Sequence, residues 1–165
     1  IKELEKSFEK CMVFHIGREE NNNYHWRDVL FQANNIIMNG AFSKMQQFAD
    51  EIYTGLDLKK EMEGCHDMHT VPLFEQLKKI GASRRNFAKV LTYLSEKFSI
   101  GDLISLSDRL NNASNMWNRI RLKTMKMAIV TSQQSHTEKI AEKIREVAEY
   151  EVRIAQDLEL LVNGN

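Results

Sequence analysis

The sequence predicts an all-α protein, a bundle of about six to seven helices that ends in a long antiparallel helical hairpin. Apolar residues recur at spacings of three and four along nearly the whole chain, which is the period of amphipathic helices. A single proline, Pro72, interrupts the 165 residues. The hydrophobic fraction of 42% is enough to form a core in one domain of this length without a disulfide or a metal.

We interpret the chain as one helical domain, with residues 26–162 as its core and residues 1–25 as a linker or peripheral segment. Ile1, Leu4 and Phe8 share one face of an expected helix, but the three consecutive asparagines within residues 17–23 are typical of a loop. Because the first residue is Ile1 rather than Met, we expect the chain to be a piece of a longer polypeptide.

Two short helices are expected at the start of the core. The first carries apolar residues from Trp26 to Ile37 and should stop at Gly40, since glycine readily takes a left-handed cap conformation. The second runs from Phe42 towards Gly55, and the two should pack through their apolar faces. The apolar period weakens over residues 56–69, which we interpret as a helix turn followed by a loop.

The middle of the chain is divided by the signals that usually start and stop helices. Thr70 is expected to cap a helix with Pro72 in its first turn, and this helix should end at Gly81. Ser83 is expected to cap the next helix. Ser99, with an acidic residue three positions later, resembles a capping box for the helix after that.

The last two helices are predicted to be long and antiparallel. Each carries a heptad-like apolar seam, typical of packed helical hairpins. The seam residues are Leu103, Leu106, Leu110, Ala113, Trp117 and Ile120 in the first helix, and Ile140, Ile144, Val147, Ile154, Leu158 and Leu161 in the second. Glu151 occupies one seam position of the second helix, where it could pair with a buried arginine or line a cleft.

Charge and composition argue against several classes of function. The 23 basic side chains balance the 23 acidic ones, so we expect no nucleic-acid partner. Apolar runs are far shorter than the roughly 20 residues of a membrane span, so we also expect no membrane insertion. Two cysteines in a chain without a signal-like start favour reduced thiols and a cytoplasmic location.

The densest group of metal-capable side chains is Cys65, His66, Asp67 and His69, of which Cys65, His66 and His69 are the metal candidates. Glu63, three residues before His66, imitates half of the carboxylate–histidine pattern of di-iron bundles, but such bundles need two of these pairs and further glutamates. We therefore interpret the segment as a solvated loop and keep the three residues as weak metal candidates. No cofactor is expected.

We predict no catalytic residue in this chain. Cys11 or Cys65 would need a histidine base and an orienting partner, and no local motif joins either thiol to a histidine. Cys11 lies on an apolar stripe, where cysteines are mostly core fillers.

Four residues are candidates for ligand binding. Arg84 and Arg85 are expected in the first turn of a helix, where guanidinium and backbone N–H groups can hold a phosphate or a carboxylate. The alternative is two solvated arginines that contribute little to folding. Trp117 and Arg121, one turn apart, can form a stacking ledge for a ligand, although a tryptophan on a heptad seam is more often part of the core.

Several short motifs, in order, resemble the helical C-terminal domain of proteins similar to butirosin biosynthesis protein H. The resemblance runs from about Val29 to Leu160. Four motifs carry it, in chain order. The first is Ala33 through Gly40, followed by Phe42 to Met45 and Phe48-Ala49, and the second is Ile80-Gly81 with Arg84 and Phe87. The third is Met116 to Ile120, and the fourth is the acidic helix that contains Glu151. The glycine-rich turn usual before the arginine is reduced here to Gly81-Ala82-Ser83.

In that family the domain follows a cysteine-peptidase-like N-terminal domain, which holds the nucleophilic cysteine and the histidine. The best-understood member transfers an acyl group from an acyl carrier protein to an aminoglycoside amine. The resemblance therefore implies an accessory domain in bacterial antibiotic biosynthesis, which shapes a substrate cleft or docks a carrier protein, with the missing N-terminal domain as its partner. The alternative is a non-enzymatic interaction module that forms a homodimer through its heptad seams.

Overall fold

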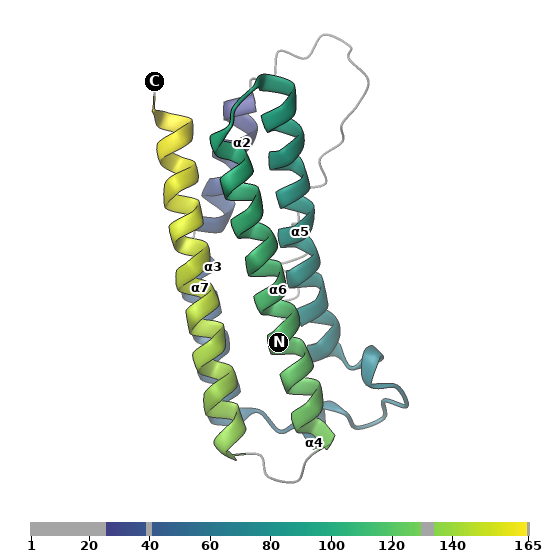
Figure 1. Ribbon diagram of the computed structural model, residues 1–165. Coiled ribbons are helices and arrows are strands. Elements are labelled where there is room, and N and C mark those ends of the chain that lie inside the picture. The colour runs from purple at the N-terminus through teal and green to yellow at the C-terminus, as the bar shows by residue number, and fades with distance from the viewer. Residues whose placement is uncertain (1–25, 39–40, 130–133, 165) are drawn as a thin grey trace.

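The computed structural model describes residues 26–38, 41–129 and 134–164, and these ranges form an all-helical bundle (Figure 1). The predicted fold class is confirmed, because the described residues form helices and no strand. The elements in chain order are α2 (Trp26–Met38), α3 (Ala41–Gly55), α4 (Leu58–Glu61), the 3-10 helix η1 (Met68–Thr70), α5 (Pro72–Phe98), α6 (Asp102–Ile129) and α7 (Gln134–Asn163). The predicted N-terminal segment, residues 1–25, and the predicted stop at Gly40 lie outside the described ranges.

The three long helices α5, α6 and α7 lie along a common direction, and α2 and α3 lie against α7 (Figure 1). Side-chain pairs between Arg109 and Asp157 and between Trp117 and Glu151 show that α6 and α7 run in opposite directions. Residues 130–133, which connect these two helices, lie outside the described ranges, so the hairpin turn itself stays a prediction. The expected packing of α2 on α3 is minor, because both helices pack mainly on α7.

The core contains the apolar faces of the described α-helices. Its largest fully buried side chains include Trp117, Phe74, Leu30, Leu58, Leu77, Leu91, Leu103, Ile144 and Leu158. Eleven of the twelve predicted seam residues of α6 and α7 are buried, and Leu161 is half-buried. Within the described ranges, no helix is both long enough and apolar enough to cross a bilayer.

The predicted break in the middle of the chain is wrong, because α5 continues without interruption through Gly81 and Ser83. Gly81 is buried against α6, and a Cβ atom at this position would lie 3.4 Å from Asn118 Oδ1 and 3.4 Å from the backbone oxygen of Ser114. The Ser83 hydroxyl donates to the backbone oxygen of Ile80, one turn earlier, instead of capping a new helix. Gly81 therefore permits close helix packing and does not end the helix.

The two ends of α5 also differ from the predicted caps. Pro72 occupies the first turn as predicted, but the N-cap residue is Val71, and Thr70 belongs to η1. Ser99 is the C-cap residue, in the left-handed conformation with φ 55°, and its backbone N–H donates to the oxygen of Ser95. The predicted capping box at Ser99 is therefore wrong, because the serine ends α5 instead of starting α6.

Candidate functional site

A buried polar cluster joins the three long helices. The carboxylate of Glu151 on α7 accepts two hydrogen bonds from Arg84 on α5, at 2.8 Å from Nε and 2.7 Å from Nη2. It also accepts a hydrogen bond of 2.8 Å from the indole Nε1 of Trp117 on α6. The Glu151 side chain is only 4% exposed, the Arg84 side chain is 15% exposed, and Trp117 is fully buried. Arg84, Trp117 and Glu151 are called the polar cluster below.

The local sequence brings these residues together through helix packing. Trp117 and Glu151 each occupy a position on an apolar seam, which turns both side chains toward the core. Gly81 lies on the face of α5 that meets α6. A Cβ atom added at Gly81 would lie 3.5 Å from Trp117 Cβ. Because glycine has no side chain, α5 can approach α6 closely, and Arg84 lies on α5 three residues after this contact.

The polar cluster is internally paired. Arg84 Nη1 donates a further hydrogen bond of 3.0 Å to the hydroxyl of Ser83. Both carboxylate oxygens of Glu151 accept at least one hydrogen bond, which is the condition under which a charge is tolerated in a protein interior. Of the two alternatives for Glu151, pairing with an arginine is confirmed, and the arginine is half-buried. The cluster connects three helices and binds its own members rather than presenting a carboxylate to solvent.

Of the four residues predicted to bind a ligand, the structure brings Arg84 and Trp117 together at the Glu151 carboxylate. Arg84 and Arg85 lie inside α5, so the prediction that they begin a helix is wrong, and so is the solvated position of Arg84. Arg85 is exposed. Trp117 is enclosed by the core and presents no ring face to solvent. Arg121 donates to the backbone oxygen of Phe74 at 3.2 Å. Ligand binding by any of these four residues stays a prediction.

The weak metal candidates lie between α4 and η1. Within the described part of the chain, no three His, Cys, Asp or Glu side chains gather closely enough to hold a metal ion. The Nδ1 atom of His69 lies 3.2 Å from Arg121 Nη2. A guanidinium group can only donate, so this nitrogen of His69 acts as an acceptor and holds the arginine. His69 thus has a structural contact, and His66 is exposed.

The thiols do not form a described nucleophile site. Cys65 is half-buried, and its backbone N–H donates to the oxygen of Met62. Cys11, His15 and His25, together with the side chain of His136, lie outside the described part of the chain. The absence of catalysis by either cysteine stays a prediction.

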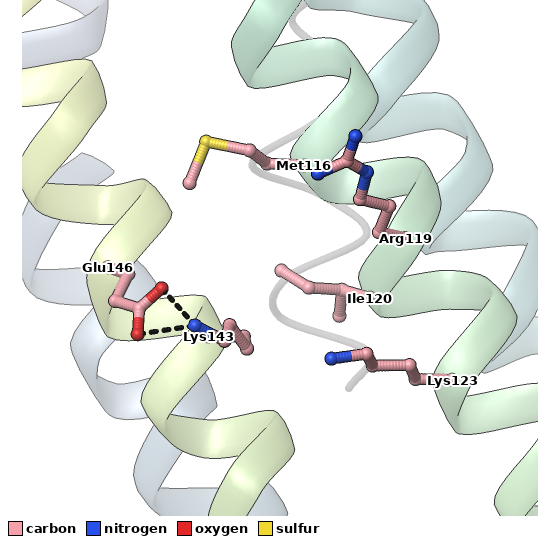
Figure 2. A pocket seen from close by; sticks show the side chains of 6 residues that line it. All are labelled: Met116, Arg119, Ile120, Lys123, Lys143 and Glu146. Carbon is pink, nitrogen blue, oxygen red and sulfur yellow. Dashed lines mark hydrogen bonds and ion pairs between the residues drawn. The ribbon is translucent and has the colours of Figure 1, made fainter.

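A groove on the surface between α6 and α7 was not predicted from the sequence (Figure 2). It has a volume of about 170 Å³. Met116, Arg119, Ile120 and Lys123 line it from α6, and Lys143 and Glu146 line it from α7. Ile120 is buried and Met116 is half-buried, whereas the four charged side chains are exposed. The groove therefore combines an apolar floor with a rim of three cations and one carboxylate.

The comparisons with known proteins find no relative of this chain. No protein-family model matches it. No curated protein and no solved structure matches it either. The resemblance to proteins similar to butirosin biosynthesis protein H therefore rests on the residues named above.

Proposed function

We propose that this bundle is an accessory helical domain of an acyl-transferring enzyme in bacterial antibiotic biosynthesis. In this role it shapes a substrate cleft or docks a carrier protein, and it does not carry the chemistry. One observation supports the proposal most: Gly81, Arg84, Trp117 and Glu151, all of which carry the resemblance, meet in a single buried contact between three helices. Residues that lie far apart in the sequence thus serve one structural purpose.

The polar cluster suits an accessory domain better than an active site. A catalytic carboxylate must reach a substrate, whereas Glu151 is buried and holds Arg84 and Trp117. In the resembling family, the nucleophile and its base belong to the preceding domain. We therefore assign acyl transfer to that domain and expect the whole protein to act in the cytoplasm, where its thiols stay reduced.

The reading frame that encodes the chain provides the first test. A cysteine-peptidase-like domain encoded upstream of Ile1 is expected, and its absence would refute the proposal. The second test is a transfer assay with the whole protein, an acylated carrier protein and an amine acceptor. Deleting residues 26–164 should abolish transfer to the amine while the upstream domain stays folded by circular dichroism. Unchanged transfer after this deletion would count against a role in substrate or carrier recognition.

Dimerisation through the heptad seams is the second candidate. The structure removes its main premise, because the seam residues are buried within one chain, apart from half-buried Leu161. The exposed apolar residues Leu122 and Ile129, which lie two turns apart on α6, are the observation that still favours a self-association surface. Sedimentation equilibrium decides the question, because a single monomeric species at high concentration excludes the dimer.

A further inference from the structure

The α6/α7 groove carries positive charge that no described side chain neutralises. Arg119 and Lys123, one turn apart on α6, make no hydrogen bond or ion pair with any described residue. Lys143 on the opposite wall is paired with Glu146, with 2.6 Å between Nζ and each carboxylate oxygen. Figure 2 shows Lys123 projecting from α6 toward α7, while Lys143 turns toward Glu146. The α6 wall is thus the cationic side of the groove.

The floor of the groove is apolar. Met116 reaches across from α6 toward α7, and Ile120 fills the space one turn further along (Figure 2). A methionine at such a position can adapt its shape to an incoming apolar group, because its side chain is unbranched and polarizable. An occupant that matches both features needs an apolar group flanked by anionic groups.

The size of the groove indicates what kind of occupant it accepts. Pockets that enclose a whole small-molecule ligand usually measure roughly 300 to 1,000 Å³, and this groove is smaller at about 170 Å³. That space is suited to one apolar side chain of a partner rather than to a complete ligand. The groove also follows the seam between two long helices, which is the geometry that receives a third helix.

We propose that the α6/α7 groove docks an acidic amphipathic helix of a partner protein. One apolar side chain of this helix packs against Met116 and Ile120. Two carboxylates one turn apart lie against Arg119 and Lys123, which have the same spacing on α6. Glu146 repels a third carboxylate on the α7 side, so the docked helix must present its neutral or basic edge there. The inference names a surface for the docking role proposed above and rests on that proposal for its biological partner.

A designed peptide tests the groove directly. The probe is a fluorescein-labelled helical peptide of about four turns, with one leucine flanked by glutamates on one face. Fluorescence anisotropy at low salt, about 0.05 M, gives its Kd with the intact chain. The charge-reversed variant Arg119→Glu/Lys123→Glu is expected to bind at least about tenfold more weakly. Met116→Ser should also weaken binding, because it removes the apolar contact without changing the charge.

The matched control is Arg85→Glu/Lys89→Glu on α5. These two exposed cations are also one turn apart, and the substitution changes the net charge by the same amount. The control should bind the peptide within about twofold of the unmodified chain, because Arg85 and Lys89 lie on α5 and do not line the groove. A second peptide with glutamine in place of every glutamate should bind at least about tenfold more weakly than the acidic probe. Circular dichroism confirms that all variants remain folded.

Three results would overturn the proposal. Equal losses in the control and in the groove variant would show that the peptide senses net charge alone. Unchanged binding by the groove variant would place the peptide elsewhere. Groove-dependent binding of octanoate without binding of the peptide would assign the groove to a small amphipathic anion. None of these results depends on an upstream catalytic domain. A refuted groove proposal can therefore be distinguished from a refuted proposed function.

Discussion

Replacing Arg84 by alanine should destabilise the protein far more than replacing its neighbour Arg85. Arg84 supplies two of the three hydrogen bonds to the Glu151 carboxylate, which is only 4% exposed. The substitution leaves a buried charge whose remaining partner is the indole N–H of Trp117. Removing one partner of a buried ion pair usually costs about 3 to 5 kcal/mol. We expect about 3 kcal/mol, the lower end, because Arg84 is itself 15% exposed and water can enter the space it leaves.

Urea and thermal denaturation followed by circular dichroism measure this difference. For a domain of this size, about 3 kcal/mol corresponds to a fall in Tm of roughly 6 to 12 °C. Arg85→Ala is the matched control, since its side chain is exposed on the same helix, and it should change the free energy of unfolding by less than about 0.5 kcal/mol. Equal small effects from both substitutions would refute the reasoning, because they would show that the ion pair does not hold α5 to α7.

Gly81, Ser99 and Cys65 can each be tested by substitution. Gly81→Leu should lower the free energy of unfolding by about 1 to 3 kcal/mol, because the leucine pushes α5 away from α6. Gly81→Ala should change the free energy of unfolding by less than about 1 kcal/mol. Urea denaturation measures both values. Ser99→Gly should raise the free energy of unfolding by about 0.5 to 1 kcal/mol by relieving the left-handed conformation, and unchanged or lower stability would contradict this. The purified chain should not turn over thioester or peptide substrates, and thiol-dependent turnover that disappears in Cys65→Ser would place chemistry in this domain.

The helices could be predicted from the sequence, but their boundaries in the middle of the chain could not. Gly81 followed by Ser83 has the local pattern of a stop and a new cap, yet both residues lie inside α5. The deciding contact is with Ser114 and Asn118 on α6, where a side chain larger than alanine would crowd the interface. A local pattern does not distinguish a glycine that ends a helix from one that lets two helices meet, because the difference depends on a partner more than 30 residues away.

The candidate sites show the same dependence on packing. Glu151 could be recognised because a carboxylate on an apolar seam needs a partner, and a buried arginine was one of the predicted alternatives. That the partner is Arg84, 67 residues earlier in the chain, depends on how α5 and α7 are arranged. The groove was missed because Arg119, Lys123 and Lys143 look like ordinary surface cations in the sequence. The available signal was the position of Arg119 and Lys123 on either side of Ile120, a seam residue.

The role of the polar cluster in the fold can be tested by removing both of its charges. Arg84→Met alone should be less stable than the double variant Arg84→Met/Glu151→Leu, because the second change removes the unpaired buried charge. The double variant still leaves the Trp117 N–H without a partner, at about 1 to 3 kcal/mol, so it should not regain full stability. We hypothesise that the cluster mainly specifies how α7 is rotated against α5 and α6.

A shift of α7 by one residue would rotate its side chains by about 100° about the helix axis. This rotation would move Lys143 and Glu146 away from α6 and change the groove. The affinity of the groove for the acidic peptide therefore reports on the rotation of α7. The double variant should therefore bind the acidic peptide with an altered affinity that its stability alone does not explain, and its NMR spectrum should show broadened amide signals. Sharp signals and unchanged peptide affinity in the double variant would show that the apolar seams alone set the rotation of α7.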